Sequence, residues 1–254
     1  MNGSLWPQGK KSAAMFTFDL DGDVIWRNMS ADEPNTEKLI RARSIGQYGP
    51  NRCVDMILDL LDKYGVKATF FVPGYVAEHN PAVIQKIAGA GHEIGNHGYT
   101  HERFVEKSRE EQIEISENTQ KIIKEITGKA PVGFRTPSGD WAVETPYLLE
   151  ERGFSYSSSM RGDDRPYHTV LDGRVTDFIE IPSKWELDDY VAQAYSCLLY
   201  TAPQKPQAHQ SGHRRQQTPP HCLFAPERSD SLPHSRRPPL PPDGGHLAFF
   251  LKSF

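Results

Sequence analysis

Short β-type runs alternate with segments of helical periodicity from residue 14 to residue 185, and this alternation constrains the fold more than any other feature. Runs rich in β-branched and aromatic residues predict six strands, at 14–18, 66–72, 92–96, 132–137, 154–160 and 177–185. Apolar residues at helical spacing predict helices between them, at 51–65, 80–91, 110–127 and 143–153. Strands that alternate with helices form βαβ units, so we expect a parallel sheet with right-handed crossovers.

Local signals predict where several of these helices begin and end. Asn80 is a candidate cap with Pro81 at the first helical position, and Gly65 is a candidate C-terminal cap. Ser108 with Glu111 three residues later forms a capping box. The long helix after it should bury isoleucines 113, 115, 122, 123 and 126, and residues 23–49 read as a polar loop.

The placement of polar clusters favours a barrel over an open sheet. Such clusters follow several different predicted strands, and no GxGxxG motif follows the first strand, as an open Rossmann-type sheet would require. The length of 254 residues suits one α/β domain of barrel size. We assign residues 1–195 to this domain.

The periodic pattern stops at about Cys197. Residues 196–254 hold 10 of the 20 prolines and 5 of the 10 histidines, and carry a net charge of +4 against −8 in residues 1–195. This composition cannot bury enough apolar surface to offset the entropy of ordering. We expect either a disordered tail, whose RPPLPP segment suits an aromatic-lined groove, or a non-native segment from a frameshift or chimera. The break in mid-domain favours the second interpretation.

Composition also limits the compartment and the partners. Three cysteines, two of them beyond residue 195, exclude a disulfide framework and a CxxC metal site in the first part of the chain. The sequence shows no signal peptide and no apolar run of membrane-spanning length, so a cytoplasmic protein without a membrane partner is expected. The acidic balance of residues 1–195 argues against a nucleic-acid partner.

Two polar motifs follow predicted strands. Asp19 and Asp21 end the first strand within FDLDGD, and His97 and His101 follow the third within HGYTH. One carboxylate and two imidazoles can hold a divalent metal and leave a coordination position open, which is the pattern of a catalytic site. The second carboxylate remains as a base, which indicates a metal-assisted hydrolase. The alternatives are a tight acidic turn or partial calcium loop for the first motif, and surface or capping histidines for the second.

Four motifs together, TFDLDGD, ATFFVPG, GHEIGNHGYTHE and FRTPSGD, resemble the polysaccharide deacetylase family, carbohydrate esterase family 4, in order and spacing. They are most similar to its intracellular peptidoglycan-deacetylase-like and allantoinase-like branch. The resemblance covers residues 14 to about 190. It implies an α/β fold, a distorted parallel (β/α) barrel of the polysaccharide deacetylase type, here incomplete at the C-terminus. It also implies hydrolysis of amide bonds, most often of N-acetyl groups on amino sugars.

The resemblance assigns roles to individual residues. It implies that Asp19 is the general base and that Asp21, His97 and His101 hold the metal. Within FRTPSGD, Arg135 would orient Asp19, because an always-charged planar fork can hold a carboxylate in its ionised form. A surface arginine in a Pro/Gly turn is the alternative.

Three further roles follow from the same resemblance. The backbone amide of Ser138 would bind the oxyanion. The segment IPSKWELDD resembles a later motif in which Trp185 would line the acyl pocket and Asp188 or Asp189 would pair with the arginine. A half-buried core tryptophan with solvated carboxylates is the alternative. The family's general-acid histidine has no counterpart, since His209, His213, His221, His234 and His246 lie in no leucine-rich strand.

The sequence therefore predicts a metal-dependent hydrolase of a C–N amide bond that deacetylates an N-acetylated sugar or a related small amide. The metal is expected to be Zn²⁺, and Co²⁺, Ni²⁺ or Fe²⁺ suit the same ligands. The partner is a small-molecule or glycan substrate, and a homo-oligomer is left open. Alternatives are a hydrolase of a cyclic amide, ureide or imide, as in allantoinases, and an inactive truncated scaffold whose tail binds a partner.

Overall fold

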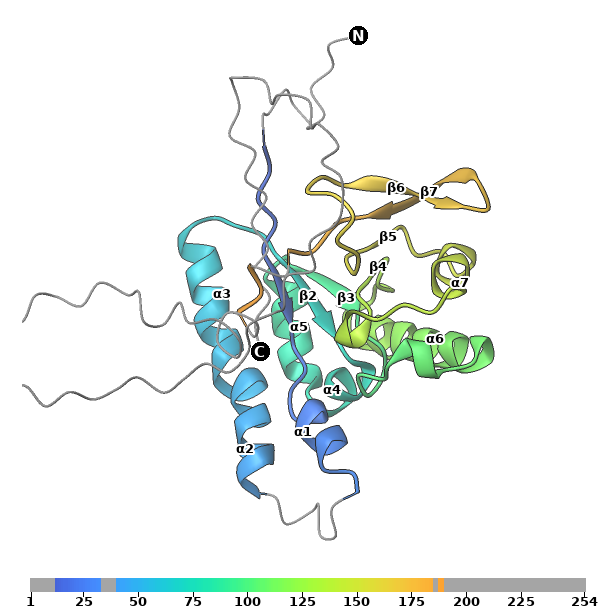
Figure 1. The fold of residues 1–254 in the computed structure, drawn as a ribbon. Helices are drawn as coiled ribbons and strands as arrows, with labels where there is room; N and C mark the ends of the chain where they lie inside the picture. Colours follow the sequence, from blue (N-terminus) through green and yellow to red (C-terminus); the bar gives the residue numbers. More distant parts are fainter. Residues whose placement is uncertain (1–11, 33–39, 185–186, 190–254) are drawn as a thin grey trace, which may run out of the picture.

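The computed structural model describes residues 12–32, 40–184 and 187–189, and these build one seven-stranded sheet with helices around it (Figure 1). The strands are β1 (Thr17–Asp19), β2 (Thr69–Val72), β3 (Glu93–Asn96), β4 (Gly133–Phe134), β5 (Tyr156–Ser157), β6 (Tyr167–Leu171) and β7 (Arg174–Glu180). Their order across the sheet is β1-β2-β3-β4-β5-β7-β6. All neighbours are parallel except β6 and β7, which form an antiparallel hairpin at the edge.

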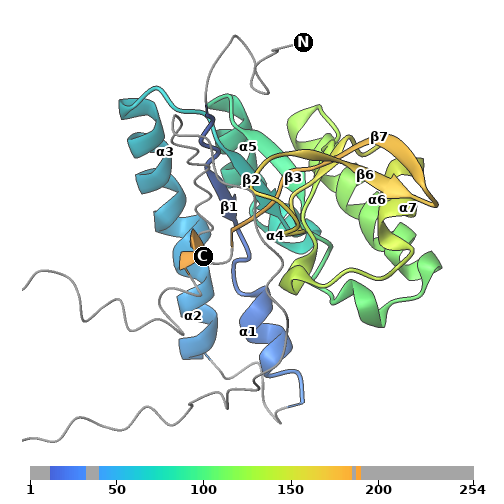
Figure 2. The same cartoon turned by 45° about the horizontal axis from the view of Figure 1, so that its top comes forward.

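Helices follow β1, β2, β3 and β4, as βαβ crossovers require, whereas β5 is followed by the hairpin strand β6. The helices are α1 (Val24–Met29), α2 (Ile40–Tyr48), α3 (Val54–Lys63), α4 (Gly74–His79), α5 (Pro81–Gly89), α6 (Arg109–Thr127) and α7 (Thr145–Glu151). Shorter turns are the π-turn η3 (Gly49–Cys53) and the 3₁₀ turns η4 (Phe104–Glu106) and η5 (Pro137–Gly139). In Figures 1 and 2, α5 lies between α3 and α6 and contacts both. No helix in the described ranges is long and apolar enough to cross a bilayer.

The predicted alternation and the parallel sheet are confirmed. β1 and β6 stand at opposite edges of the strand order, so these seven strands do not close a barrel. The proposed domain boundary at residue 195 and the whole C-terminal segment lie outside the described residues, so both remain predictions.

Two buried clusters hold the helices against the sheet. The larger contains Leu20, Val54, Phe70, Val76, Ile84 and Ile123 among its members, and fills the space between β1 to β3 and the helices α3 to α6. The smaller is built from Phe104, Phe134, Leu148, Leu149, Phe154 and Phe178 under α7. Burying this apolar surface on one side of the sheet leaves its other side free to carry polar side chains.

Several predictions about local structure were wrong. The polar loop at 23–49 contains α1 and α2, and α4 follows β2 directly. Both α1 and α4 are 6 residues long, so neither has the periodicity that a sequence pattern needs. The hairpin strand β6 was missed because its pattern is half exposed. Asn80 precedes α5 as predicted, with Pro81 at the first position, but its side chain donates to Val76 O instead of capping the helix.

The buried face of α6 also differs from the prediction, although its capping box at Ser108 and Glu111 is confirmed. The buried residues are Gln112, Ser116, Thr119 and Ile123, so only one of the five predicted isoleucines is fully buried. The other four isoleucines are half-buried and pack against the two core clusters. The polar residues lie between them, where Thr119 donates to the backbone oxygen of Gly98 in the loop after β3 and the Ser116 carbonyl accepts from Asn96.

Candidate metal centre

The parallel register of β1, β2 and β3 brings the two sequence motifs to one edge of the sheet. Asp19 lies opposite Phe71, and Phe71 lies opposite Gly95, two residues before His97. Because the strands run in the same direction, their carboxyl ends meet and the polar residues that follow them share one site. Residues about eighty positions apart in the chain thus become neighbours.

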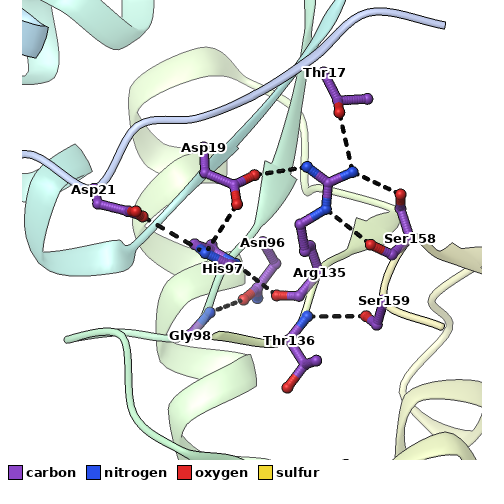
Figure 3. Close-up of polar contacts among 10 residues, drawn as sticks. All are labelled: Thr17, Asp19, Asp21, Asn96, His97, Gly98, Arg135, Thr136, Ser158 and Ser159. Carbon is purple, nitrogen blue, oxygen red and sulfur yellow. Dashed lines mark hydrogen bonds and ion pairs between the residues drawn. The ribbon is translucent and has the colours of Figure 1, made fainter. Parts of the chain in front are cut away.

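Asp21, His97 and His101 converge with geometry that suits a metal ion. Each offers one ligand atom, and these atoms all lie within 4.8 Å of one another. Nε2 of His97 is 3.5 Å from Oδ1 of Asp21 (Figure 3). Asp21 and His97 are buried and His101 is half-buried, so the site opens on the side of His101. Three electron-pair donors around one volume are what a divalent cation binds.

The orientation of the His97 ring is set by the strand beside it. Its Nδ1 lies 2.7 Å from the backbone oxygen of Arg135. A carbonyl can only accept, so Nδ1 carries the proton and Nε2 is the atom that faces Asp21 and Asp19. Metal-binding histidines are commonly held in this way, because the backbone acceptor fixes the tautomer.

A turn after β1 brings both aspartates into the same pocket. Two carboxylates one residue apart on a strand would point to opposite faces. Here the strand ends at Asp19, and Gly22 takes a φ of +56°, a conformation that glycine adopts without strain. Asp23, which the sequence left without a role, is buried and pairs with Arg27 at 2.8 Å at the start of α1.

Arg135 holds Asp19 through a buried network. Its Nη1 donates to Oδ1 of Asp19 at 2.7 Å, and its Nη2 and Nε donate to Ser158 Oγ and Ser158 O at 2.7 and 2.8 Å (Figure 3). Nη2 also donates to Thr17 Oγ1 at 3.0 Å. The guanidinium stacks 4.2 Å above the ring of Phe71. Because hydrogen bonds hold the edges of the guanidinium and the Phe71 ring holds its face, Arg135 fixes the Asp19 carboxylate beside the candidate metal site.

Comparison with known proteins shows which family the chain is similar to. A sequence model of the family described as polysaccharide deacetylase matches residues 47–157. Residues 47–157 of the chain are similar to a polysaccharide deacetylase domain.

Three relatives show how far the likeness extends. The peptidoglycan deacetylase of Helicobacter pylori is 29% identical over 202 residues, which cover 71% of this chain and 68% of that protein. A crystal structure of a Mycobacterium smegmatis protein assigned to the polysaccharide deacetylases is 39% identical, with a TM-score of 0.66 and coverage of 73% of this chain and 63% of that one. The PuuE allantoinase structure is 24% identical with a TM-score of 0.64 over 75% of this chain and 68% of that one, and shows the shared fold alone. The chain thus spans about two thirds of the length of these relatives.

The other residues predicted for the site, as far as the structure describes them, are not shown in contact with the candidate metal centre. Ser138 is exposed in η5, where its φ of +60° marks a strained turn of the kind found at functional sites, and its amide stays a predicted oxyanion donor. Asp188 is buried and Asp189 half-buried, but the arginine fork reaches Asp19 instead of either. Trp185 lies outside the described residues. His92 is structural, because its Nδ1 accepts from the Ala68 amide at 3.2 Å.

Two serines and a glutamate in the network around Arg135 were not predicted. Ser158 grips Arg135, and Ser159 Oγ accepts from the Thr136 amide at 3.0 Å. Glu180 ends β7, and its Oε1 accepts from the amides of Ser159 and Met160 at 2.6 and 2.8 Å. Only the run of serines in a predicted strand could have drawn attention to this segment. Glu180 thus stabilises the backbone at 159–160, next to Ser158, which contacts Arg135.

Glu180 should also make the stability of the folded domain depend on pH. Burial raises the pKa of its carboxyl above the usual value for glutamate. The folded protein then binds this proton more tightly than the unfolded chain, so the free energy of unfolding falls as pH rises from the ordinary pKa through the raised one. Glu180→Gln removes the charge and keeps an acceptor oxygen for the two amides. We expect the variant to lose this decline, which begins at the ordinary glutamate pKa of about 4.3 and ends at the raised one.

Urea unfolding at several pH values measures this effect. The control is Glu114→Gln, an exposed position on α6, which should leave the pH dependence as in the wild type. If Glu180→Gln and wild type show the same slope of unfolding free energy against pH, the carboxyl is not the group responsible.

Proposed function

We propose that this domain is a metal-dependent hydrolase that removes N-acetyl groups from an amino sugar of a glycan. One observation carries the proposal: Asp21, His97 and His101 converge within 4.8 Å beside Asp19, which is held by Arg135. The name of the Helicobacter pylori relative directs the substrate class toward peptidoglycan.

The ligand set suits zinc. Two imidazoles and one carboxylate with an open position are typical of catalytic zinc, and Co²⁺, Ni²⁺ or Fe²⁺ accept the same donors. When bound, a divalent metal in such a site polarises the amide carbonyl and lowers the pKa of a water molecule. The chain's own contribution is to hold the three ligand side chains and the base in fixed positions around it.

Asp19 is the proposed base because its two oxygens serve different purposes. Oδ1 receives the hydrogen bond of Arg135 at 2.7 Å, and Oδ2 lies 3.6 Å from Nε2 of His97, on the side of the candidate metal site. An ionised carboxylate there can take a proton from the attacking water. Arg135 keeps that oxygen aimed at the site and favours the charged form of the carboxylate.

Expulsion of the amine requires an acid that the described part of the chain does not place in this site. The histidines other than the two ligands make contacts elsewhere, His79 with Tyr75 O, His92 with the Ala68 amide and His168 with Thr176 O. We therefore expect amine expulsion to limit turnover by this chain, even where the substrate and the metal bind.

Acetate release tests the function. The purified chain, loaded with Zn²⁺ or Co²⁺, is assayed on N-acetylglucosamine oligomers and on peptidoglycan fragments. Allantoin and a cyclic imide are assayed separately as alternative substrates, by their disappearance. Asp19→Asn should lower any activity by about 10²- to 10⁴-fold, whereas Asp55→Asn, on the exposed side of α3 and paired with Lys86, should not. Turnover of the cyclic substrates alone would favour the allantoinase-like alternative. Metal binding without turnover of any substrate would favour an inactive scaffold.

A further inference from the structure

Helix α6 buries polar side chains directly behind the loop that carries the two histidines. Ser116 and Thr119 are both fully buried, on the face that packs against β3 and the residues after it. A helix gains most by burying apolar side chains, and burying a hydroxyl costs free energy unless it is hydrogen-bonded. Ile123 of the same helix is also buried, and the other isoleucines are half-buried and pack against the core clusters. The polar face therefore calls for an explanation in terms of what it contacts.

Two of its hydrogen bonds go to the residues that flank His97, whereas the Ser116 hydroxyl donates within the helix to Gln112 O at 2.7 Å. Thr119 Oγ1 donates to Gly98 O at 2.9 Å. Asn96, the last residue of β3, donates from Nδ2 to Ser116 O at 2.9 Å, and its Oδ1 accepts from the Gly98 amide at 3.0 Å (Figure 3 shows the second bond). Both polar groups of the Gly98 backbone are thus tied, directly or through Asn96, to α6.

The rest of the His97 backbone is held from the opposite side. The His97 amide donates to Val72 O at 3.2 Å, and the Gly74 amide donates to Gly98 O at 2.9 Å. Gly74 makes this approach feasible, because a Cβ there would lie 2.5 Å from Thr119 Oγ1. The backbone at 97–98 is therefore clamped between β2 and α6, and a clamped backbone leaves the imidazole little freedom beyond its two side-chain torsions.

We propose that Asn96 and Thr119 are positioning residues for the metal ligand His97. This inference rests on the proposed metal-dependent function. Their hydrogen bonds fix the position of the backbone around His97. The hydrogen bond from His97 Nδ1 to Arg135 O then fixes the orientation of the ring, so that Nε2 faces Asp21 without rearrangement. Groups that orient a metal ligand from behind typically change metal affinity by about 10- to 100-fold when they are removed.

Zinc affinity, measured by competition with a chromophoric chelator, tests the proposal. Thr119→Val keeps the shape of the side chain and removes the donor to Gly98 O, so we expect zinc to bind about 10-fold more weakly. The matched control is Thr127→Val on the same helix, whose hydroxyl donates to Ile123 O at 2.8 Å away from the site. It should leave zinc affinity unchanged. Thr119→Ser restores a hydroxyl donor and should recover most of the lost affinity.

A second measurement separates positioning from general stability. The absorption spectrum of the Co²⁺-loaded protein reports ligand geometry, and we expect it to change in Thr119→Val and not in Thr127→Val. If Thr119→Val does not fold, Thr119→Ala replaces it. Equal zinc affinity in wild type and a folded Thr119 variant, or equal losses in the Thr119 and Thr127 variants, would overturn the inference. Failure of the wild type to bind zinc or Co²⁺ at all would instead overturn the proposed function.

Discussion

Replacing Arg135 with methionine should lower the free energy of unfolding by about 3–5 kcal/mol, because it leaves the carboxylate of Asp19 buried without its cation. Asp19 is 1% exposed and Arg135 is 3% exposed, so solvent cannot replace the lost charge. Methionine fills much of the same volume, which limits the effect of a cavity. Ser158 would lose its guanidinium donors at the same time. Urea unfolding of the metal-free protein measures the change.

An exposed arginine provides the control. Arg109→Met removes the ion pair with Glu151 at 2.5 Å on the surface, where such pairs contribute about 1 kcal/mol or less. The double variant Arg135→Met with Asp19→Asn should recover part of the loss, since it removes the buried charge as well. A loss below about 1 kcal/mol for Arg135→Met would show that Asp19 is stabilised by other groups.

Replacing His101 with glutamine should weaken zinc binding by more than about 100-fold. Losing a direct ligand lowers metal affinity more than losing a residue that only orients a ligand. His101 is half-buried at the open side of the site, so the fold should tolerate the change. Its backbone has a φ of +60°, which glutamine adopts with some strain, and thermal unfolding of the metal-free variant measures that cost separately.

The matched control for His101→Gln is His79→Gln. His79 is an exposed histidine at the end of α4 whose ring stacks on Tyr75. It offers the same imidazole chemistry without neighbouring ligands. Equal zinc affinity in wild type and His101→Gln would remove His101 from the metal centre and leave only Asp21 and His97 as candidates.

Local sequence patterns were informative where neighbours in the chain are also neighbours in space. The capping box at Ser108 and Glu111 depends on residues three positions apart, and the helix begins there as predicted. Pro81 and Gly65 mark a helix start and the end of a helix for the same reason. Short elements such as α1 and α4 gave no such pattern, because 6 residues do not complete two helical turns.

The candidate site was predictable only in part. The short motifs drew attention to Asp19, Asp21, His97 and His101, because their residue types and spacing suit metal chemistry. Ser158 and Glu180 could not be found in this way. Their side chains act on Arg135 or on the segment beside it, and that relation exists only because β4, β5 and β7 are adjacent in the sheet.

The sequence by itself determined the alternation of strands and helices, the parallel sheet and the four residues around which the site forms. Only the tertiary structure decided which carboxylate Arg135 holds, since its bond to Asp19 spans 116 positions in the chain. It also decided which face of α6 is buried. There, hydrogen bonds to Asn96 and Gly98 place polar residues between the isoleucines, which pack against the two core clusters, because a backbone group in the interior needs a partner.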